Sequence, residues 1–326
     1  MPILCPSELK GARVFITGGA GFLAANVVEA LVEDCEIVAL DNLRRNSAAY
    51  APWRNHRHYD LVHGDVLDVG TVRICALGAD YILHMAAIAG LPTVVFNPGL
   101  VLRTNMVGTM NVLDAVRREA PKCRRFIDFS TSEVYGPMVF RAHEDGMTSV
   151  GSLYEPRWFY AVSKLASEFL TRAAYVEGAL PTLSIRPFNI YGPYQTGEGC
   201  VRNFVTAART GRPLVVHGHG DQIRSWCYVD DMTRAILAAM THPDAVGHVF
   251  NVGNPRATTS TLELANAVIR LTGSTSKIEY QEIEYPDVEV RVPSIKAATE
   301  HLGFHPLVNL EDGLKQTIAW WEGKDV

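Results

Sequence analysis

Tyr160 and Lys164 are the two side chains of this sequence best suited to move a proton. They stand four residues apart at the start of a segment with a helical pattern, so both project from one helix face, ~6 Å apart at Cβ. An ammonium group beside a phenol stabilises the phenolate and lowers the pKa of the phenol, which would make Tyr160 a usable base. The structural alternative is a surface tyrosine and lysine one turn apart, so the pair needs support from other residues.

A second polar segment, STSEVYG at residues 130–136, directly follows an expected strand. Ligands of open α/β sheets bind at the carboxyl ends of the strands. There Thr131 and Ser132 would offer hydroxyl groups to a sugar, and Glu133 could transfer a proton. The structural alternative is a turn rich in serine and threonine that caps the next segment.

A glycine-rich turn, TGGAGFLA, follows the first expected strand and opens a helix. Gly18 and Gly21 would allow a tight turn and let the backbone approach a pyrophosphate, at which the positive end of the helix would point. Asp41 ends the second strand ~20 residues further on, where a carboxylate accepts hydrogen bonds from an adenosine ribose. Its charge would repel a 2′-phosphate, so NAD is favoured over NADP, although Arg44 and Arg45 weaken this preference slightly. A purely structural strand–helix turn is the alternative.

These residues need a scaffold that brings strand ends together, and the chain has the pattern of one. Short β-branched runs alternate with longer helical patterns, which predicts right-handed βαβ units. Expected strands are 13–17, 36–40, 58–62, 81–85 and 125–130, and expected helices are 21–33, 101–119 and 158–177. The predicted fold class is α/β, a Rossmann-type doubly wound parallel sheet.

After about residue 180 the alternation becomes irregular. Strand patterns at 182–186, 214–217 and 248–252 and helical patterns at 201–210, 230–241, 262–271 and 311–322 are separated by Gly/Pro-rich joints. We expect residues 1–180 to form an NAD-binding domain and residues 181–326 a smaller, mixed α/β lobe for the substrate. The boundary is approximate, and segments of the two are expected to interleave.

Composition excludes several classes of partner. The 326 residues carry a net charge of −5 and contain no apolar stretch of membrane-spanning length, so neither nucleic acid nor a membrane is expected as a partner. The six cysteines are scattered, with no CxxC pair and no Cys/His cluster at metal-ligand spacing. We therefore expect no metal site and a cytoplasmic protein with reduced thiols.

Together these motifs resemble the extended short-chain dehydrogenase/reductase family of NAD-dependent nucleotide-sugar epimerases, dehydratases and decarboxylases. Further segments in the family's order are GDV at 64–66, HMAA at 84–87, NMVGTMNVL at 105–113, RPFNIYGP at 186–193 and RSWCYVDD at 224–231. The resemblance implies NAD as cofactor and a nucleotide-diphosphate sugar as substrate. The implied cofactor-binding residues are Gly18, Gly21, Phe22, Leu23, Asp41, Asn42, Asp65, Val66, Ala86, Ala87, Asn105, Tyr160 and Lys164. The implied substrate-binding residues are Thr131, Asn189, Arg224 and Arg291.

The resemblance also implies how the reaction begins. Tyr160 would take the proton of the sugar C4 hydroxyl while hydride passes to NAD⁺, which gives a 4-keto sugar. Family 4,6-dehydratases place an Asp-Glu pair where this chain has Ser132 and Glu133, so dehydration is disfavoured. Simple C4 epimerases need no carboxylate at Glu133. If C5 bears a carboxylate, the 4-keto sugar is a β-keto acid that loses CO₂ readily, and Glu133 and Arg291 could assist.

Local segments favour this third outcome. PRWFY at 156–160, NVGNP at 251–255 and RVPSI at 291–295 resemble UDP-glucuronate decarboxylases. We therefore expect a decarboxylase of a UDP-hexuronic acid. Its expected catalytic residues are Tyr160, Lys164, Thr131, Ser132, Glu133 and Arg291. C4 epimerisation stays open, because uronate epimerases can share the first segment and Arg291 could merely bind diphosphate. An NAD-binding protein without chemistry is disfavoured, because the tyrosine, the lysine and the STSE residues occur together.

The resemblance implies a homodimer as well. Family members pair their subunits through a four-helix bundle, which the expected helices 101–119 and 158–177 would supply. Core helices have similar apolar faces, so the pattern by itself does not settle the assembly.

Overall fold

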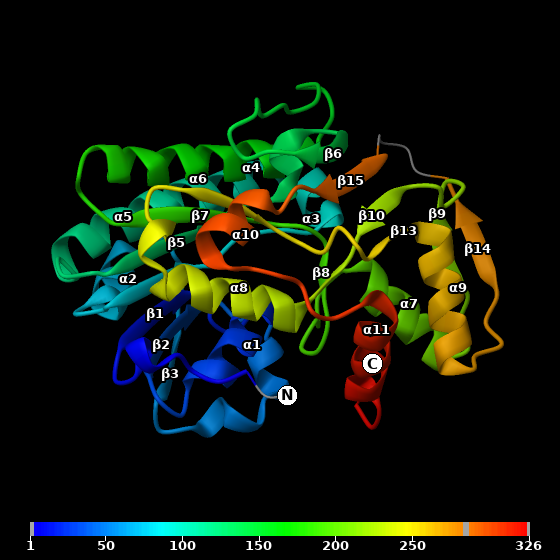
Figure 1. Ribbon diagram of the computed structural model, residues 1–326, viewed down its shortest axis with the longest axis horizontal. Coiled ribbons are helices and arrows are strands. Elements are labelled where there is room, and N and C mark those ends of the chain that lie inside the picture. The colour runs from blue at the N-terminus through cyan, green and yellow to red at the C-terminus, as the bar shows by residue number, and fades with distance from the viewer. Residues whose placement is uncertain (1–2, 283–286, 325–326) are drawn as a thin grey trace.

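A parallel sheet of seven strands forms the centre of the molecule (Figure 1). The computed structural model describes residues 3–282 and 287–324, and the strand order is β12-β7-β5-β4-β1-β2-β3. Every neighbouring pair in this sheet is parallel. The strands are β1 Arg13–Thr17, β2 Glu36–Asp41, β3 Tyr59–His63, β4 Tyr81–His84, β5 Arg125–Phe129, β7 Thr182–Pro187 and β12 Val249–Val252. The predicted Rossmann-type fold class is confirmed.

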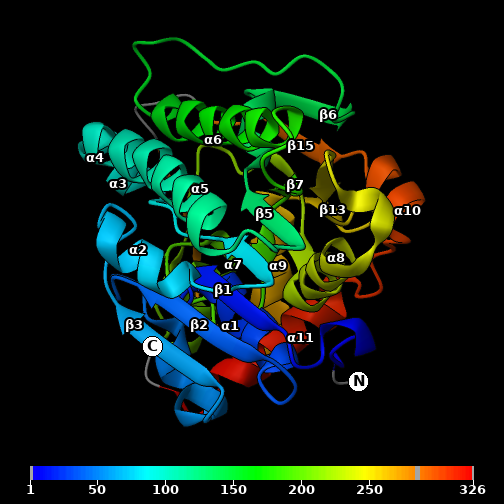
Figure 2. The ribbon, with the colours of Figure 1, turned by 90° about the vertical axis from the view of Figure 1, so that its left-hand side faces the viewer.

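Helices cover both faces of the sheet, as Figure 2 shows. One face packs against α2 (Val69–Ala76), α5 (Gly108–Glu119) and α6 (Trp158–Val176), and the other against α1 (Phe22–Leu31), α8 (Val229–Thr241) and α10 (Lys296–Leu302). The strands are therefore buried on both sides, which explains why they read as continuous apolar runs and not as alternating ones.

The strand order reverses at β1. From this strand the chain continues to β2 and β3 on one side, and β4, β5 and β7 follow on the other. The loops after β1 and β4 consequently diverge and leave a crevice at the carboxyl ends of the two strands. The glycine-rich turn and the HMAA segment both lie at this edge.

The segment expected as one helix at 101–119 is more complex. It consists of α4 (Pro98–Leu102), a π-helical turn at Arg103–Val107 and α5, and α3 (Leu91–Phe96) precedes it. A π turn widens the helix locally and often occurs at functional sites. Here Thr104 and Asn105 are buried in it. The Asn105 amide holds the loop after β4, because its Oδ1 accepts the Ile88 N–H at 2.8 Å and its Nδ2 donates to the Ile88 carbonyl at 3.2 Å.

A smaller mixed sheet and two short strand pairs lie beside the large sheet (Figure 1). The mixed sheet has the order β13-β10-β15-β6, and the strand pairs are β11-β8 and β14-β9. The strands are β6 Met138–Ala142, β8 Ile190–Tyr191, β9 Leu214–His217, β10 Ile223–Ser225, β11 Cys227–Tyr228, β13 Thr258–Ser260, β14 Ile278–Gln281 and β15 Val290–Pro293. The helices α7 (Cys200–Arg209), α9 (Thr261–Thr272) and α11 (Leu310–Trp321) pack around a core of their own.

The sheets take strands from both halves of the chain. β7 and β12 follow residue 180 but belong to the large sheet, whereas β6 precedes it and belongs to the mixed sheet. In the described ranges, 3–282 and 287–324, no helix is both long and apolar enough to cross a membrane.

Candidate active site

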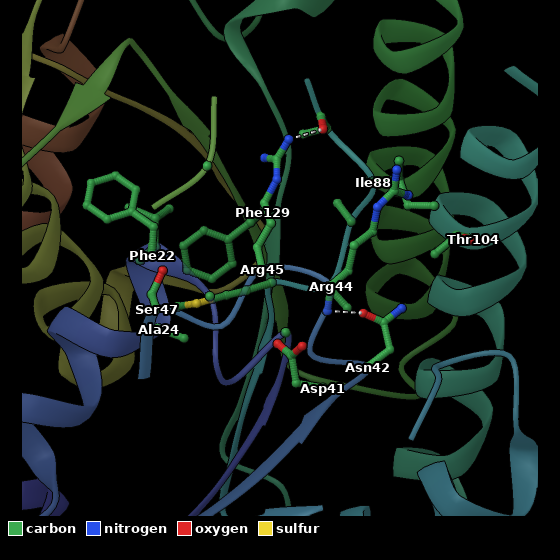
Figure 3. A pocket seen from close by; sticks show the side chains of 18 of the residues that line it. Phe22, Ala24, Asp41, Asn42, Arg44, Arg45, Ser47, Ile88, Thr104 and Phe129 are labelled. Carbon is green, nitrogen blue, oxygen red and sulfur yellow. Dashed lines mark hydrogen bonds between the residues drawn. The ribbon is translucent and has the colours of Figure 1, made fainter. Parts of the chain in front are cut away.

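A cavity of about 430 Å³ opens where the strand order reverses. Most of the residues expected to hold the cofactor line it: Gly18, Gly21, Phe22, Leu23, Asp41, Asn42, Asp65, Val66, Ala86 and Ala87. Figure 3 shows Asp41 and Asn42 next to each other at the end of β2, with Phe22 and Ala24 of α1 to one side. Thr131 and Tyr160 line the same cavity, so the expected cofactor and substrate residues meet in one place.

The glycine-rich turn fits a bound dinucleotide. Gly18 has φ +68°, and a Cβ on it would lie 2.8 Å from the Ala86 nitrogen. Gly19, which we did not single out in the sequence, has no room for a side chain either, because its Cβ would lie 2.5 Å from that of Ala39. Gly21 caps α1 without a side-chain hydrogen bond, so the first N–H groups of the helix are available to a phosphate.

Asp41 is buried at the end of β2 and holds the turn together. Its Oδ2 accepts the Ala20 N–H at 3.0 Å and its Oδ1 accepts the Leu43 N–H at 2.7 Å. Burial raises the pKa of Asp41, and these two hydrogen bonds lower it in part. Each carboxylate oxygen keeps a further lone pair for the cofactor ribose, so the cavity, the helix end and this acid together fit NAD.

Tyr160 lies in the first turn of α6, and Thr131 lies at the end of β5. The Thr131 hydroxyl acts on the phenol of Tyr160 and lowers its pKa in part. Thr131 also caps the short 3₁₀ helix Ser132–Tyr135, because its Oγ1 accepts the Glu133 N–H at 3.2 Å. Its hydroxyl proton is therefore free to be donated to the phenol oxygen of Tyr160. The capping role and the site role, which the sequence offered as alternatives, are compatible.

Lys164 has a different partner from the one we expected. Its side chain is 1% exposed, and its Nζ lies 3.7 Å from Oδ1 of Asp128, a fully buried residue of β5. The pKa of Tyr160 is raised and not lowered: burial is the main cause, and the negative charges of Glu133 and Asp128 add to it. Lys164 is not among the main causes that set the pKa of Tyr160 in this structure, in which its ammonium group pairs with Asp128.

Glu133 and Arg291 form an ion pair, with Oε1 of Glu133 3.5 Å from Nη1 of Arg291. The charge of Glu133 raises the pKa of Tyr160 and that of Arg291 lowers it, so the pair lies within electrostatic reach of the phenol. Arg291 comes from β15, where it pairs in register with Arg224 of β10. Nη2 of Arg224 lies 3.4 Å from Oδ1 of Asp287. The mixed sheet thus brings two buried arginines to the substrate side of the site.

The remaining expected residues do not line this cavity. Asn105, Lys164, Ser132, Glu133, Asn189, Arg224 and Arg291 are not among the lining residues. Asn189 has φ 43° and donates from Nδ2 to the Ser225 carbonyl at 3.0 Å, which ties the end of β7 to β10. Several lining residues were not expected, among them Ser47, Phe129, Gln195 and Glu198. Phe129 ends β5, Ser47 begins a short 3₁₀ helix, and the other two lie in a loop; none belongs to a motif that the sequence made recognisable. The described residues contain no cluster of acidic, histidine or cysteine side chains that could hold a metal ion.

Comparisons with known proteins agree with this geometry. The model of the NAD dependent epimerase/dehydratase family matches residues 14–253. UDP-N-acetyl-alpha-D-glucosaminuronate decarboxylase of Bacillus cytotoxicus is 34% identical over 319 residues, which cover 95% of this chain and 97% of the relative. UDP-glucuronic acid decarboxylase 1 of Xenopus tropicalis is 32% identical over 327 residues, which cover 98% of this chain and 74% of the relative.

Among solved structures, the dTDP-glucose 4,6-dehydratase DesIV of Streptomyces venezuelae, with NAD and TYD bound, has a TM-score of 0.87 and 27% identity. The match covers 96% of this chain and 97% of that chain. The relatives thus include both decarboxylases and dehydratases of nucleotide sugars, and NAD is named in the description of the family and is bound in the DesIV structure. This chain belongs to the NAD-dependent epimerase/dehydratase family of nucleotide-sugar enzymes, and its cofactor is NAD.

Proposed function

We propose that this protein decarboxylates a UDP-hexuronic acid, UDP-glucuronate in the first place, through a 4-keto intermediate. The observation that carries the proposal is the ion pair of Glu133 and Arg291 beside Tyr160. Nε and Nη2 of Arg291 are buried and have no hydrogen-bond partner among the residues that the structure describes. A buried guanidinium with unpaired N–H groups is costly unless an anion completes it. A sugar carboxylate next to the reacting carbon would be such an anion.

In the proposed mechanism Tyr160 acts first as a base. Its phenolate takes the proton of the C4 hydroxyl, and the Thr131 hydroxyl donates a hydrogen bond to the phenol oxygen. NAD⁺, held by Gly18, Gly21 and Asp41, would accept the hydride from C4 and later return it. Lys164 supplies a fixed positive charge beneath the site. The product of this step is a sugar with a ketone at C4.

Glu133 and Arg291 would act in the second step. With a ketone at C4, the C5–carboxylate bond breaks, CO₂ leaves and its electron pair forms an enolate of C4 and C5. The positive charge of Arg291 would stabilise this enolate, and Glu133 would deliver a proton to C5. Reduction at C4 and return of the proton by Tyr160 would complete the UDP-pentose. Asn189 and Arg224 would hold the nucleotide diphosphate.

The names of the two decarboxylase relatives support this substrate class. C4 epimerisation is the second candidate, because Tyr160, Thr131 and the cofactor cavity alone are sufficient for it. Epimerisation would give the ion pair of Glu133 and Arg291 no role in the reaction. For dehydration of C4 and C6, Ser132 stands where an acid is needed.

Incubation of the enzyme with NAD⁺ and UDP-glucuronate separates these candidates. A product lighter by one CO₂ supports the proposal, and a product of unchanged mass with C4 inverted establishes the epimerase. If no uronate is converted, the inferred substrate is wrong. Tyr160→Phe should abolish turnover with NAD binding unchanged, whereas the matched change Tyr175→Phe, on the same helix but outside the cavity, should leave both unchanged.

We also propose that α5 and α6 pair two copies of the chain. Exposed apolar residues recur every seven positions on α6, at Val162, Phe169 and Val176. The adjacent segment has Leu100 and Val107 at the same spacing. Met110 on α5 is exposed as well. Since α6 packs against α4, the π turn and α5, a second copy with the same apolar residues would cover them.

A further inference from the structure

A buried carboxylate, that of Asp128, lies beside the proposed catalytic lysine and has no part in the mechanism above. Asp128 is the fourth residue of β5, two positions before the STSE segment. It is 0% exposed, and its Oδ1 lies 3.7 Å from the Lys164 Nζ. Oδ1 accepts no hydrogen bond of normal length from any described residue. Its nearest cation is therefore its principal partner.

The surroundings of this pair leave Lys164 no other source of negative charge. On the neighbouring strand β4, His84 stands in register with Asp128. Burial and the positive charge of Lys164 lower the pKa of His84 to about 3, so the imidazole is neutral. From β7, Ser184 contributes a hydroxyl 3.5 Å from Oδ2 of Asp128. From α6 comes Glu168, whose charge also reaches Asp128.

Glu168 forms an ion pair with Arg186. Its two carboxylate oxygens accept hydrogen bonds from Nε and Nη2 of Arg186, at 2.8 and 2.7 Å. Within the described part of the chain, Asp128 is accordingly the one carboxylate that forms an ion pair with Lys164. A fully buried ammonium group without a counter-charge loses its proton readily.

We propose that Asp128 is a positioning residue, which draws the Lys164 ammonium group toward β5 and thereby sets the pH range in which Tyr160 works as a base. The inference rests on the proposed function, because it concerns the same tyrosine and lysine. It adds a residue that does not contact the sugar. Asp128 acts on the reaction through the charge and position of Lys164.

Two effects of Asp128 on Tyr160 have the same sign. Its negative charge raises the pKa of the phenol directly. It also attracts the Lys164 ammonium, which would otherwise be free to approach the phenolate and lower that pKa. Loss of the charge at Asp128 should therefore let Tyr160 ionise at lower pH.

The ionisation of Tyr160 can be measured without any substrate. In the NAD-bound protein, tyrosine labelled with ¹³C at Cζ reports each phenol by NMR, and Tyr160→Phe identifies the signal of Tyr160. We expect this signal to titrate at lower pH in Asp128→Asn than in the wild type. Asp60→Asn, on the exposed edge strand β3 of the same sheet, is the matched control and should not move it. A Tyr160 titration that is unchanged, or shifted to higher pH, in Asp128→Asn overturns the proposal.

A second uncharged variant tests the proposal if the first one does not fold. If Asp128→Asn does not fold, the smaller Asp128→Ser must shift the Tyr160 signal in the same direction, and Asp128→Glu must titrate like the wild type. With UDP-glucuronate, the acidic limb of the kcat/KM profile should shift with the NMR titration. A shifted signal without turnover of any uronate would leave the role of Asp128 intact and reject the proposed substrate. Turnover of UDP-glucuronate with an unshifted Tyr160 signal would support the proposed substrate and reject the role of Asp128.

Discussion

His84 should make the protein sensitive to acid, and the size of the effect follows from its surroundings. The side chain is 1% exposed. Its Nδ1 lies 2.8 Å from the Thr17 hydroxyl and its Nε2 lies 2.9 Å from the Thr109 hydroxyl. Burial, together with the charge of Lys164, lowers the pKa of His84 from 6.5 to about 3. The folded protein therefore keeps this ring neutral, while the unfolded chain protonates it below about pH 6.5.

The sign of the effect follows directly. Stability from His84 is fully present above pH 6.5 and is lost as the pH falls toward the folded pKa of about 3. Over that window the unfolded state binds one more proton, so the free energy of unfolding should fall by about 1.4 kcal/mol per pH unit on account of His84. The full loss would be roughly 5 kcal/mol, a large part of the stability of an ordinary domain.

Urea unfolding followed by tryptophan fluorescence at several pH values between 4 and 7 measures this slope. His84→Gln keeps hydrogen-bonding groups but removes the titration. We expect it to be less stable than the wild type at pH 7 and to have the shallower slope, by about one proton. His63→Gln, exposed at the end of β3, should retain the wild-type slope. Equal slopes for the wild type and His84→Gln would refute the reasoning, because Asp128 titrates in the same window in both proteins.

Three further changes test other parts of the site and the surface. Asp41→Asn should weaken NAD binding by roughly 10- to 100-fold, as expected for the loss of a charged hydrogen-bond acceptor, and should reduce the preference for NAD over NADP. Calorimetric titration with both cofactors measures the two dissociation constants. An unchanged ratio of these constants would contradict the role of Asp41. Arg291→Met should lower kcat/KM for UDP-glucuronate about 100-fold or more and leave the affinity for NAD unchanged. If kcat/KM and NAD affinity fall by the same factor, the variant has a general structural defect. Phe169→Glu should convert the proposed dimer to a monomer in light scattering, whereas Leu307→Glu, at an exposed apolar residue of the loop before α11, should not. A wild type that is already monomeric would reject the pairing.

The sequence predicted the large sheet because its strands are buried on both faces. β1 and β4 are short runs of mostly β-branched, aliphatic and aromatic residues with polar side chains only at their ends, a pattern typical of strands in a parallel sheet. The cofactor cavity was predictable for a related reason. Its glycines and Asp41 lie at fixed distances from strand ends, and the strand ends themselves were recognisable.

Other features depend on contacts between segments far apart in the chain. The pairing of β6 with β15 brings Arg291 to the site, and neither strand has a pattern that specifies the other. The π turn at Arg103–Val107 differs from an α-helix by a change in backbone hydrogen bonding that residue types do not reveal. Asp128 reads as an isolated charge in a strand, and its partner Lys164 lies on a different element. The actual partner of Lys164 could not be inferred from spacing along one helix.

The central claim is the loss of the C5 carboxylate after oxidation at C4. UDP-glucuronate labelled with ¹³C in that carboxylate, incubated with the enzyme and NAD⁺, tests it most directly. We expect labelled CO₂ to be released in step with formation of an unlabelled UDP-pentose, and we expect neither product with Tyr160→Phe. If the label stays in a nucleotide sugar that has only changed its configuration at C4, the protein is an epimerase, and the proposed task of Glu133 and Arg291 is wrong.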